Sequence, residues 1–303
     1  MKSSKLTGHL AAAGAYAIFG FNIIFNKDIA NSGTVSPMVM FVLRALGAAA
    51  LFWALSLFLP REKVSGADLL RLALASFLGL FVPQLSFLFA IERATPVVTA
   101  VLGALCPVYT MCFAFLFLRE PISFKKAGGV AMSLGGALLL ILSSTHAAGT
   151  AETTPLGVVL LLVNGMSFAA YLGAFRPLIS RYSVVTSMKW MFLFALLLSL
   201  PFGWDGLLHH TDFASMQPMV LWEIAYVIIF ATFVAYFLIP VGQKHLRPTL
   251  VSMYSYLQPM ISAAVSVALG MDAFTWQKAL AAVLVFAGVA LVSRSRAAHQ
   301  DNP

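Results

Sequence analysis

The chain of 303 residues is 60% hydrophobic and only 10% charged, and its mean hydropathy is +0.90. About 25% of the residues in a soluble domain are charged, so this composition excludes a water-soluble enzyme and predicts a protein whose solvent is lipid. The net charge of +8 does not indicate a nucleic-acid partner, because the basic residues stand singly between apolar runs.

Ten apolar segments follow one another along the chain, each close to the length needed to cross a bilayer. They cover residues 8–28, 36–59, 69–91, 95–118, 124–143, 156–176, 185–203, 219–241, 249–271 and 276–293. The first has a basic head like that of a signal peptide, but its apolar run continues too far, and we interpret it as an uncleaved helix. The longest connection, around His209 and His210, is too short for a soluble domain and offers no further metal ligands, so no metal site is predicted.

The positions of the basic residues predict the orientation of these spans. When the connections are assigned alternately to the two sides, fifteen of the 19 Lys and Arg residues lie on the side of the N-terminus. The other side has Lys27, Arg93 and Lys278, and Arg44 lies inside a span. The sequence therefore predicts an all-α membrane protein with ten transmembrane helices and both termini in the cytoplasm.

The two halves of the chain resemble each other. Residues 94–140 align with residues 246–292 without a gap, at a constant offset of 152. The alignment pairs two prolines, two acids and two lysines: Pro107 with Pro259, Glu120 with Asp272, and Lys126 with Lys278. An offset of 149 pairs Gly8 with Gly157. Because each half has an odd number of spans, we predict two inverted five-helix repeats, residues 1–145 and 146–303, as in secondary transporters.

Polar and aromatic side chains near the middle of the spans predict a substrate cavity between the halves. Pro107 and Pro259 each remove a helix hydrogen bond about twelve residues into spans four and nine, so we expect kinks that line this cavity. The candidate substrate-binding residues are Asn22, Gln84, Tyr109, Asn164, Tyr171, Tyr236, Tyr254 and Gln258. Any one of them could instead bond only to a neighbouring helix. Together they predict a neutral, partly aromatic cavity for an amphipathic solute.

Three charged residues in or near the spans have two interpretations each. Arg44 can anchor a substrate carboxylate, or its side chain can snorkel toward carbonyls or headgroups, and the sequence favours snorkelling. Glu120 and Asp272 can carry protons, but each precedes a short break and a capping hydroxyl, Ser123 or Thr275. That position favours a structural role at a helix N-terminus.

The sequence has no signature of catalysis. The motifs GxxxxGKS, HExxH and GxSxG are missing, so we predict neither an enzyme nor a cofactor. Cys106 and Cys112 share one apolar run, and we expect two free, buried thiols.

Three stretches carry a resemblance to a known family. They are AIFGFNIIFNK in the first span, ALCPVYTMCFAFLFLREPISFKKAGG in spans four and five, and YLQPMISAAVSVALGMDAFTWQKALAA in spans nine and ten. These stretches resemble the EamA-type transporters of the drug/metabolite transporter superfamily, and the resemblance extends along essentially the whole chain. Within this family the chain looks most like the YddG-type exporters of aromatic amino acids. Asp272 in place of a second glutamate departs from that pattern.

The resemblance implies a bundle in which spans five and ten are peripheral and the other helices surround a central cavity. It also implies a carrier that moves metabolites outward across an inner membrane without ATP. We therefore expect a monomeric secondary transporter that exports aromatic amino acids by alternating access and has no nucleic-acid partner. A multidrug or other-metabolite efflux carrier is the alternative, and a channel or a membrane-embedded enzyme fits the residues less well.

Overall fold

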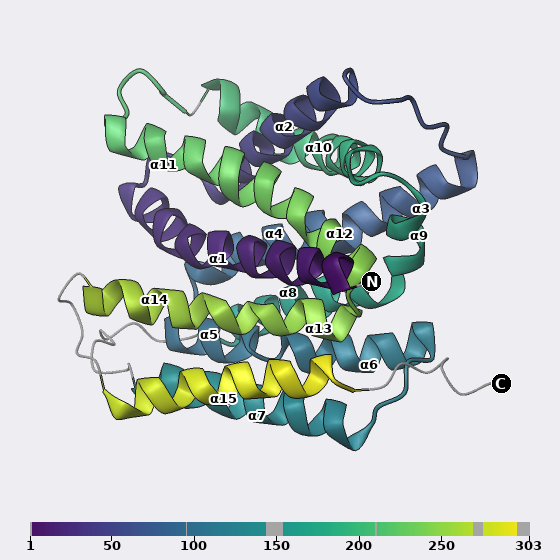
Figure 1. The fold of residues 1–303 in the computed structure, drawn as a ribbon. Coiled ribbons are helices and arrows are strands. Elements are labelled where there is room, and N and C mark those ends of the chain that lie inside the picture. The colour runs from purple at the N-terminus through teal and green to yellow at the C-terminus, as the bar shows by residue number, and fades with distance from the viewer. Residues whose placement is uncertain (1, 95, 144–153, 210, 269–274, 296–303) are drawn as a thin grey trace.

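The computed structural model describes residues 2–94, 96–143, 154–209, 211–268 and 275–295, and every regular element within these ranges is a helix. The longer helices lie side by side with their axes in roughly one direction, and they form one bundle (Figure 1). The all-helical prediction is confirmed for the described residues.

The elements follow a similar order in the two halves of the chain. The first half contains α1 (Lys2–Ser32), α2 (Pro37–Ser56), α3 (Gly66–Ser76), the π-helix η1 (Phe77–Phe81), α4 (Val82–Ile91), α5 (Pro96–Gly103), α6 (Cys106–Leu118) and α7 (Phe124–Ser143). The second half contains α8 (Pro155–Ala174), α9 (Arg176–Arg181), α10 (Val184–His209), α11 (Pro218–Ile228), the π-helix η3 (Ile229–Val234), α12 (Ala235–His245), α13 (Pro248–Met253), the 3₁₀ turn η4 (Tyr254–Tyr256), α14 (Leu257–Ala268) and α15 (Trp276–Ser293).

Nine stretches within the described residues are helical, apolar and long enough to cross a membrane. The remaining predicted span, 249–271, corresponds to α13, η4 and α14, and its last residues lie outside the described ranges. Some predicted limits are wrong, since α1 runs from Lys2 to Ser32 and α10 continues to His209. Hydropathy marks only the apolar part of a helix, whereas its backbone hydrogen bonds continue into polar flanking residues.

The two predicted proline kinks are interruptions of the helices. α5 ends at Gly103, and Pro107 lies in the first turn of α6. Likewise α13 ends at Met253, and Pro259 lies in the first turn of α14. A proline in the first turn removes no intrahelical hydrogen bond, so each span places its proline where a new helix begins.

Two π-helical segments were not predicted. η1 begins at Phe77 and η3 begins at Ile229, which are separated by the same 152 residues as the two prolines. A π-helical turn inserts one extra residue into a helix and displaces neighbouring carbonyl groups. Both long spans therefore have a widened turn near the middle of the bundle.

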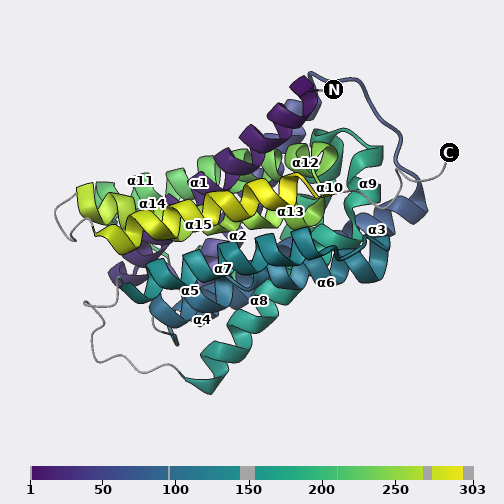
Figure 2. The same cartoon turned by 60° about the horizontal axis from the view of Figure 1, so that its bottom comes forward.

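Helices α7 and α15 pack along each other at one edge of the bundle (Figures 1 and 2). The Ser133 hydroxyl of α7 donates a hydrogen bond of 3.0 Å to the Val285 carbonyl of α15. A Cβ atom on Gly136 would lie 2.8 Å from the Ala281 carbonyl oxygen, so the two backbones approach closely. Spans five and ten are therefore peripheral, as the resemblance implied.

Two other helix crossings are also tight at glycine. A Cβ atom on Gly8 of α1 would lie 2.7 Å from Cβ of His245, at the end of α12. A Cβ atom on Gly157 of α8 would lie 2.5 Å from the Arg93 carbonyl oxygen, just after α4. These glycines were aligned in the sequence, and they permit close helix packing.

The outer surface of the bundle is apolar, as expected for a surface that contacts lipid. On α6, for example, Phe115, Leu116 and Phe117 are all exposed. The thiol prediction is half wrong, because Cys106 is buried whereas Cys112 is exposed on this outer face. Apolar neighbours in sequence do not distinguish the interior of a bundle from its lipid-facing side.

Candidate functional site

A cavity of about 340 Å³ lies where α1 ends and α2 begins, and we call this end of the bundle the cavity end. Its walls come from the last turns of α1, residues 33–37, the first turn of α2 and the last turn of α4. Asn26, Met40, Leu88 and Glu92 are among the lining residues. None of the predicted substrate-binding residues lines this cavity.

Three predicted residues lie one helical turn below it. Asn22, Arg44 and Gln84 are four residues along α1, α2 and α4 from the lining residues Asn26, Met40 and Leu88. Residues four apart share a helix face and differ in depth by about 6 Å. Below the cavity, the same three helices therefore carry a set of polar residues: Asn22, Arg44 and Gln84.

Gln84 is the residue of this group whose polar atoms lack partners. Its side chain is buried, and neither its amide oxygen nor its amide nitrogen makes a hydrogen bond of good geometry. It faces the Tyr236 hydroxyl of α12, whose ring packs edge-on against Phe19 and Phe192 at centroid distances of 5.5 and 5.6 Å. Gln84 is thus an amide beside an aromatic wall, and the Tyr236 hydroxyl is the polar group that faces it.

Arg44 does not snorkel. Its side chain is 4% exposed, and its Nε donates to the Thr232 hydroxyl at 2.9 Å. Thr232 lies in η3, and its hydroxyl donates to the Val227 carbonyl five residues earlier at 2.7 Å. The π-helical turn thus places an acceptor within reach of the guanidinium, which is why the arginine turns inward.

Asn22 is paired within its own helix. Nδ2 of Asn26 donates to the Asn22 side-chain oxygen at 2.7 Å and to the Asn22 carbonyl at 2.9 Å. Both side chains are buried. This pair links the cavity wall to the residue beneath it.

Two other predicted residues already have structural partners. Asn164 of α8 donates to the Pro83 carbonyl of α4 at 2.7 Å. The Tyr171 hydroxyl donates to the Gln243 side-chain oxygen at 3.3 Å, and a Cβ atom on Gly79 would lie 2.5 Å from its ring. These contacts join neighbouring helices, which is the alternative that the sequence left open for each polar residue.

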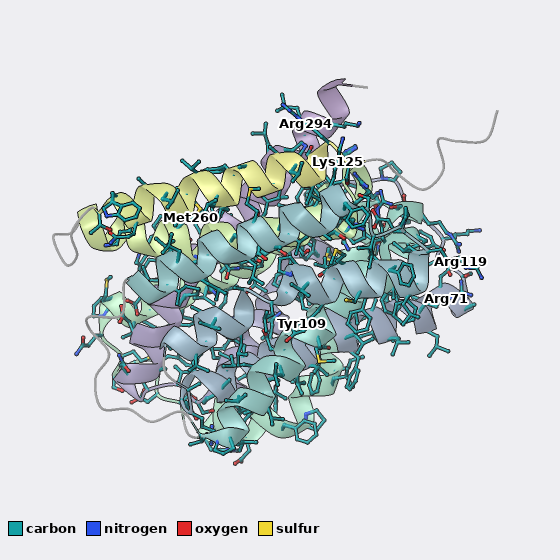
Figure 3. All side chains as sticks on the ribbon, turned by 90° about the horizontal axis from the view of Figure 1, so that it is seen from below. Arg71, Tyr109, Arg119, Lys125, Met260 and Arg294 are labelled. Carbon is teal, nitrogen blue, oxygen red and sulfur yellow. The ribbon has the colours of Figure 1, made fainter. Side chains whose placement is uncertain are left out.

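The remaining predicted residues lie in spans four and nine. Tyr109, labelled in Figure 3, packs over Gly165 of α8, and the Gln258 backbone packs near Gly20 of α1. The Tyr254 hydroxyl bonds to Nδ1 of His9 at 2.6 Å. In the described part of the chain, no hydrogen bond or ring contact connects these three residues to Arg44 or Gln84.

The opposite end of the bundle is held together by charged side chains, and we call it the network end. It contains the connections at 57–65, 119–123, 182–183 and 246–247. Glu120 lies 3.3 Å from Lys126 Nζ and 3.5 Å from Arg247 Nε, and Lys126 is only 1% exposed. Figure 3 shows further basic residues toward this end: Arg71, Arg119, Lys125 and Arg294.

Two carboxylates of the first half bond to the start of α10 and the residues before it. Asp68 accepts hydrogen bonds of 2.7 Å from both Arg181 and Tyr182. Glu62 accepts from the Ser183 backbone N–H at 2.9 Å. Partial burial alone would raise the pKa of the Glu62 carboxyl, but hydrogen bonds from Thr186 and Ser183 hold it below its ordinary value of 4.5.

The predicted role of Glu120 is structural, but its partners differ from those expected. It bonds to cations of two segments, because Arg119 in the left-handed conformation (φ 52°) turns the chain back toward them after α6. Ser123 does cap α7 through the Lys126 N–H at 3.2 Å, whereas Thr275 precedes α15 without a side-chain hydrogen bond to it. Asp272 lies outside the described residues.

Comparisons with known proteins place the chain in a family. Residues 6–142 and 155–294 match the sequence profile of the EamA-like transporter family. The chain belongs to this family. It is 25% identical to the uncharacterized inner membrane transporter YicL of Salmonella typhimurium strain LT2, over 97% of this chain and 99% of YicL. It is 23% identical to the uncharacterized transporter YetK of Bacillus subtilis strain 168, over 77% of this chain and 71% of YetK.

The same fold occurs in a crystal structure that covers 97% of each chain with a TM-score of 0.75 and 19% identity. This EamA-like transporter is therefore a multi-pass protein of the inner membrane. YicL and YetK are known as transporters without an assigned cargo, so the cargo has to be inferred from the residues.

Three buried hydroxyls of the transporter's interior are not among the predicted residues. Tyr16 of α1 and Ser255 and Tyr256 of η4 are buried, and their side-chain oxygens have no hydrogen-bond partner. The sequence does contain a hint of them, because Tyr16 lies two residues after Gly14 in the first span, and Ser255 and Tyr256 directly follow the predicted residue Tyr254. Their placement depends on the 3₁₀ turn η4, which hydropathy does not reveal.

Proposed function

We propose that this EamA-like transporter is a secondary carrier that exports small amphipathic metabolites, with aromatic amino acids as the first candidates. The observation that carries the proposal is Gln84, a buried amide that faces the Tyr236 hydroxyl without a hydrogen bond of good geometry, one helical turn below a cavity. Buried polar groups are normally hydrogen-bonded, and an exception indicates a functional group or a missing ligand. The neighbouring Phe19, Phe192 and Tyr236 rings suit a flat apolar part of the cargo.

We propose further that residues 1–145 and 146–303 form inverted repeats that exchange conformations during transport. Under the offset of 152, the contact of Gly136 with Ala281 becomes a contact between Gly288 and Gly129, and that contact also occurs. η1 maps onto η3 in the same way. The two family matches, one in each half, support the same division. In such an architecture, one end opens as the other closes around a central site.

The proposed orientation places the network end, with both termini, in the cytoplasm. It follows from the excess of Lys and Arg on that side. Single cysteines at Thr34 and at Lys63, in a background without Cys106 and Cys112, test it with a reagent that does not cross the membrane. Label should reach position 34 in intact cells and position 63 only after permeabilisation, and the reverse pattern refutes the orientation.

Two amide deletions test the proposed site. Gln84→Ala removes an amide without a hydrogen bond of good geometry, so affinity should fall roughly 2- to 150-fold, the value of one or two substrate hydrogen bonds, while stability should change by less than about 1 kcal/mol. Asn164→Ala removes the bond to the Pro83 carbonyl, so stability should fall by about 1–3 kcal/mol at constant affinity per folded molecule. Thermal unfolding and ligand titration of both variants measure the two quantities, and an effect of Gln84→Ala on stability alone rejects the site.

The cargo is tested in cells and in liposomes. Cells that overproduce the transporter should accumulate less of the toxic analogues of Phe, Tyr and Trp. Purified protein should exchange labelled amino acid against the same compound inside sealed vesicles, with saturation. Unchanged analogue levels at normal membrane expression reject aromatic amino acids, and a drug or another metabolite is then the cargo.

A further inference from the structure

Arg44 carries a buried positive charge for which the described residues provide no negative partner. A guanidinium stays protonated in proteins. The side chain is 4% exposed, and no carboxylate of the described residues lies within ion-pair distance of it. Its hydrogen bond goes to the hydroxyl of Thr232, which is neutral.

Such a charge is expensive to bury, because desolvating one ion costs several kcal/mol unless an opposite charge compensates it. Lys126 is the internal comparison, since this lysine is equally buried at the network end but lies 3.3 Å from Glu120. Among the described residues, Lys126 therefore has a carboxylate partner and Arg44 has none. A ligand carboxylate next to the Arg44 guanidinium would supply the missing charge.

The surroundings of Arg44 define the rest of that ligand. Thr232 also belongs to η3, one turn before Tyr236 on α12, and Tyr236 faces the amide of Gln84. Neither the donor nor the acceptor of the Gln84 amide makes a hydrogen bond of good geometry. The Phe19 and Phe192 rings lie against Tyr236. A guanidinium, an amide and an aromatic wall thus lie next to one another. None of the carboxylates of the described residues forms an ion pair with this guanidinium.

We propose that Arg44 selects amphipathic carboxylate anions, and that the carboxylate, not the amino group, is what the site recognises. This inference rests on the proposed transport function and narrows its cargo. A monoanion neutralises the guanidinium, whereas a zwitterionic amino acid leaves the site with one net positive charge. An aromatic monocarboxylate should therefore bind at least as well as the corresponding amino acid.

Four ligands with the same phenyl group separate these contributions: 3-phenylpropionate, L-phenylalanine, 3-phenylpropionamide and 2-phenylethylamine. Titration calorimetry on the purified, full-length protein gives their affinities. The charge-assisted hydrogen bonds of a carboxylate should favour phenylpropionate over the neutral amide by roughly 10- to 150-fold. The amine should bind more weakly still, and phenylalanine no more tightly than phenylpropionate.

Two variants of Arg44 test the assignment to this residue. Arg44→Gln should abolish the preference for phenylpropionate over its amide, and Arg44→Lys should keep part of it because the charge remains. If Arg44→Gln does not fold, the acid-to-amide ratio of the wild-type protein still decides whether the site selects anions. Unchanged acid affinity in a folded Arg44→Gln protein, with only a lower melting temperature, means that Arg44 is structural and overturns the proposal.

Hexanoate and hexylamine distinguish a wrong cargo from a wrong recognition element. If no phenyl compound binds but hexanoate binds in an Arg44-dependent manner, the aromatic cargo is wrong and the selection of anions stands. If an amine or the amide binds the wild-type protein as tightly as the acid, the selection of anions is wrong. Failure of every carboxylate to bind the folded protein also overturns it.

Discussion

At the network end, the carboxylates of Glu62, Asp68 and Glu120 each bond to a segment in the other half of the chain. At the cavity end, Glu92 pairs with its neighbour Arg93 at 3.0 Å and lines an open cavity of about 340 Å³. Acids thus connect the two halves of the chain at the network end, whereas the acid that lines the cavity bonds to its own neighbour. In the proposed transport cycle, the links of the network end have to break before that end can open.

The same substitution at the two ends should have very different effects. Glu120→Gln leaves the buried Lys126 without the carboxylate that compensates it, so the free energy of unfolding should fall by about 3–5 kcal/mol. Glu92→Gln breaks an ion pair whose side chains are 37% and 40% exposed, so the loss should stay below about 1 kcal/mol. Unfolding of both variants in mixed micelles measures this difference. Equal losses would mean that the two ends do not differ in the way the contacts suggest.

The contact between α7 and α15 tests whether tight packing is confined to the network end. Ala at Gly136 would place Cβ 2.8 Å from the Ala281 carbonyl oxygen, whereas Ala at Gly135 meets no atom within 4 Å. Both changes remove one glycine from the same helix, so they share the gain in helix propensity. Gly136→Ala should lose about 1–3 kcal/mol of stability relative to Gly135→Ala. Equal melting temperatures would show that the two helices can separate easily.

Much of the fold follows from the sequence because lipid imposes long apolar helices. The interruptions at Pro107 and Pro259 were also predictable, since a proline cannot donate its hydrogen bond inside a helix. The π-helical turns η1 and η3 were not predictable, because FLGLF and IFATFV contain no residue that requires a π-turn. They result from packing between helices that are distant in the sequence.

The candidate site was predictable in composition and not in pairing. Gln84 and Asn164 looked alike as amides within spans, yet Asn164 bonds to the Pro83 carbonyl, whereas Gln84 faces the Tyr236 hydroxyl without a hydrogen bond of good geometry. The difference depends on which helix lies opposite. For the same reason the sequence favoured a snorkelling Arg44, since the acceptor on Thr232 is 188 residues away.

A bulky residue in the cavity should separate access from stability. Ala30 lines the cavity and is exposed, so Ala30→Trp fills part of this space without disturbing the core. Transport should fall at least about tenfold, and stability should change by less than about 0.5 kcal/mol. Lys63→Trp, in an exposed connection at the network end, is the control and should leave transport unchanged. Normal flux through Ala30→Trp would show that substrate does not pass through this cavity.

The smallest expected effect concerns the link between Glu62 and Ser183 at the network end. Because the pKa of Glu62 is lower in the folded protein than its ordinary value of 4.5, folding favours the ionised carboxylate. This contribution is complete above the unfolded pKa and is lost as the pH falls through the folded pKa. The carboxylate is exposed, so solvent screening limits the contribution to less than about 1 kcal/mol.

Glu62→Gln should therefore be slightly less stable than wild type at pH 7, and the difference should shrink below about pH 4. Comparing the two proteins at each pH cancels the titration of the other groups, and Lys63→Gln controls for the loss of a neighbouring charge. A stability difference that grows on acidification would mean that Glu62 does not tie the connection between α2 and α3 to the start of α10 through its ionised form.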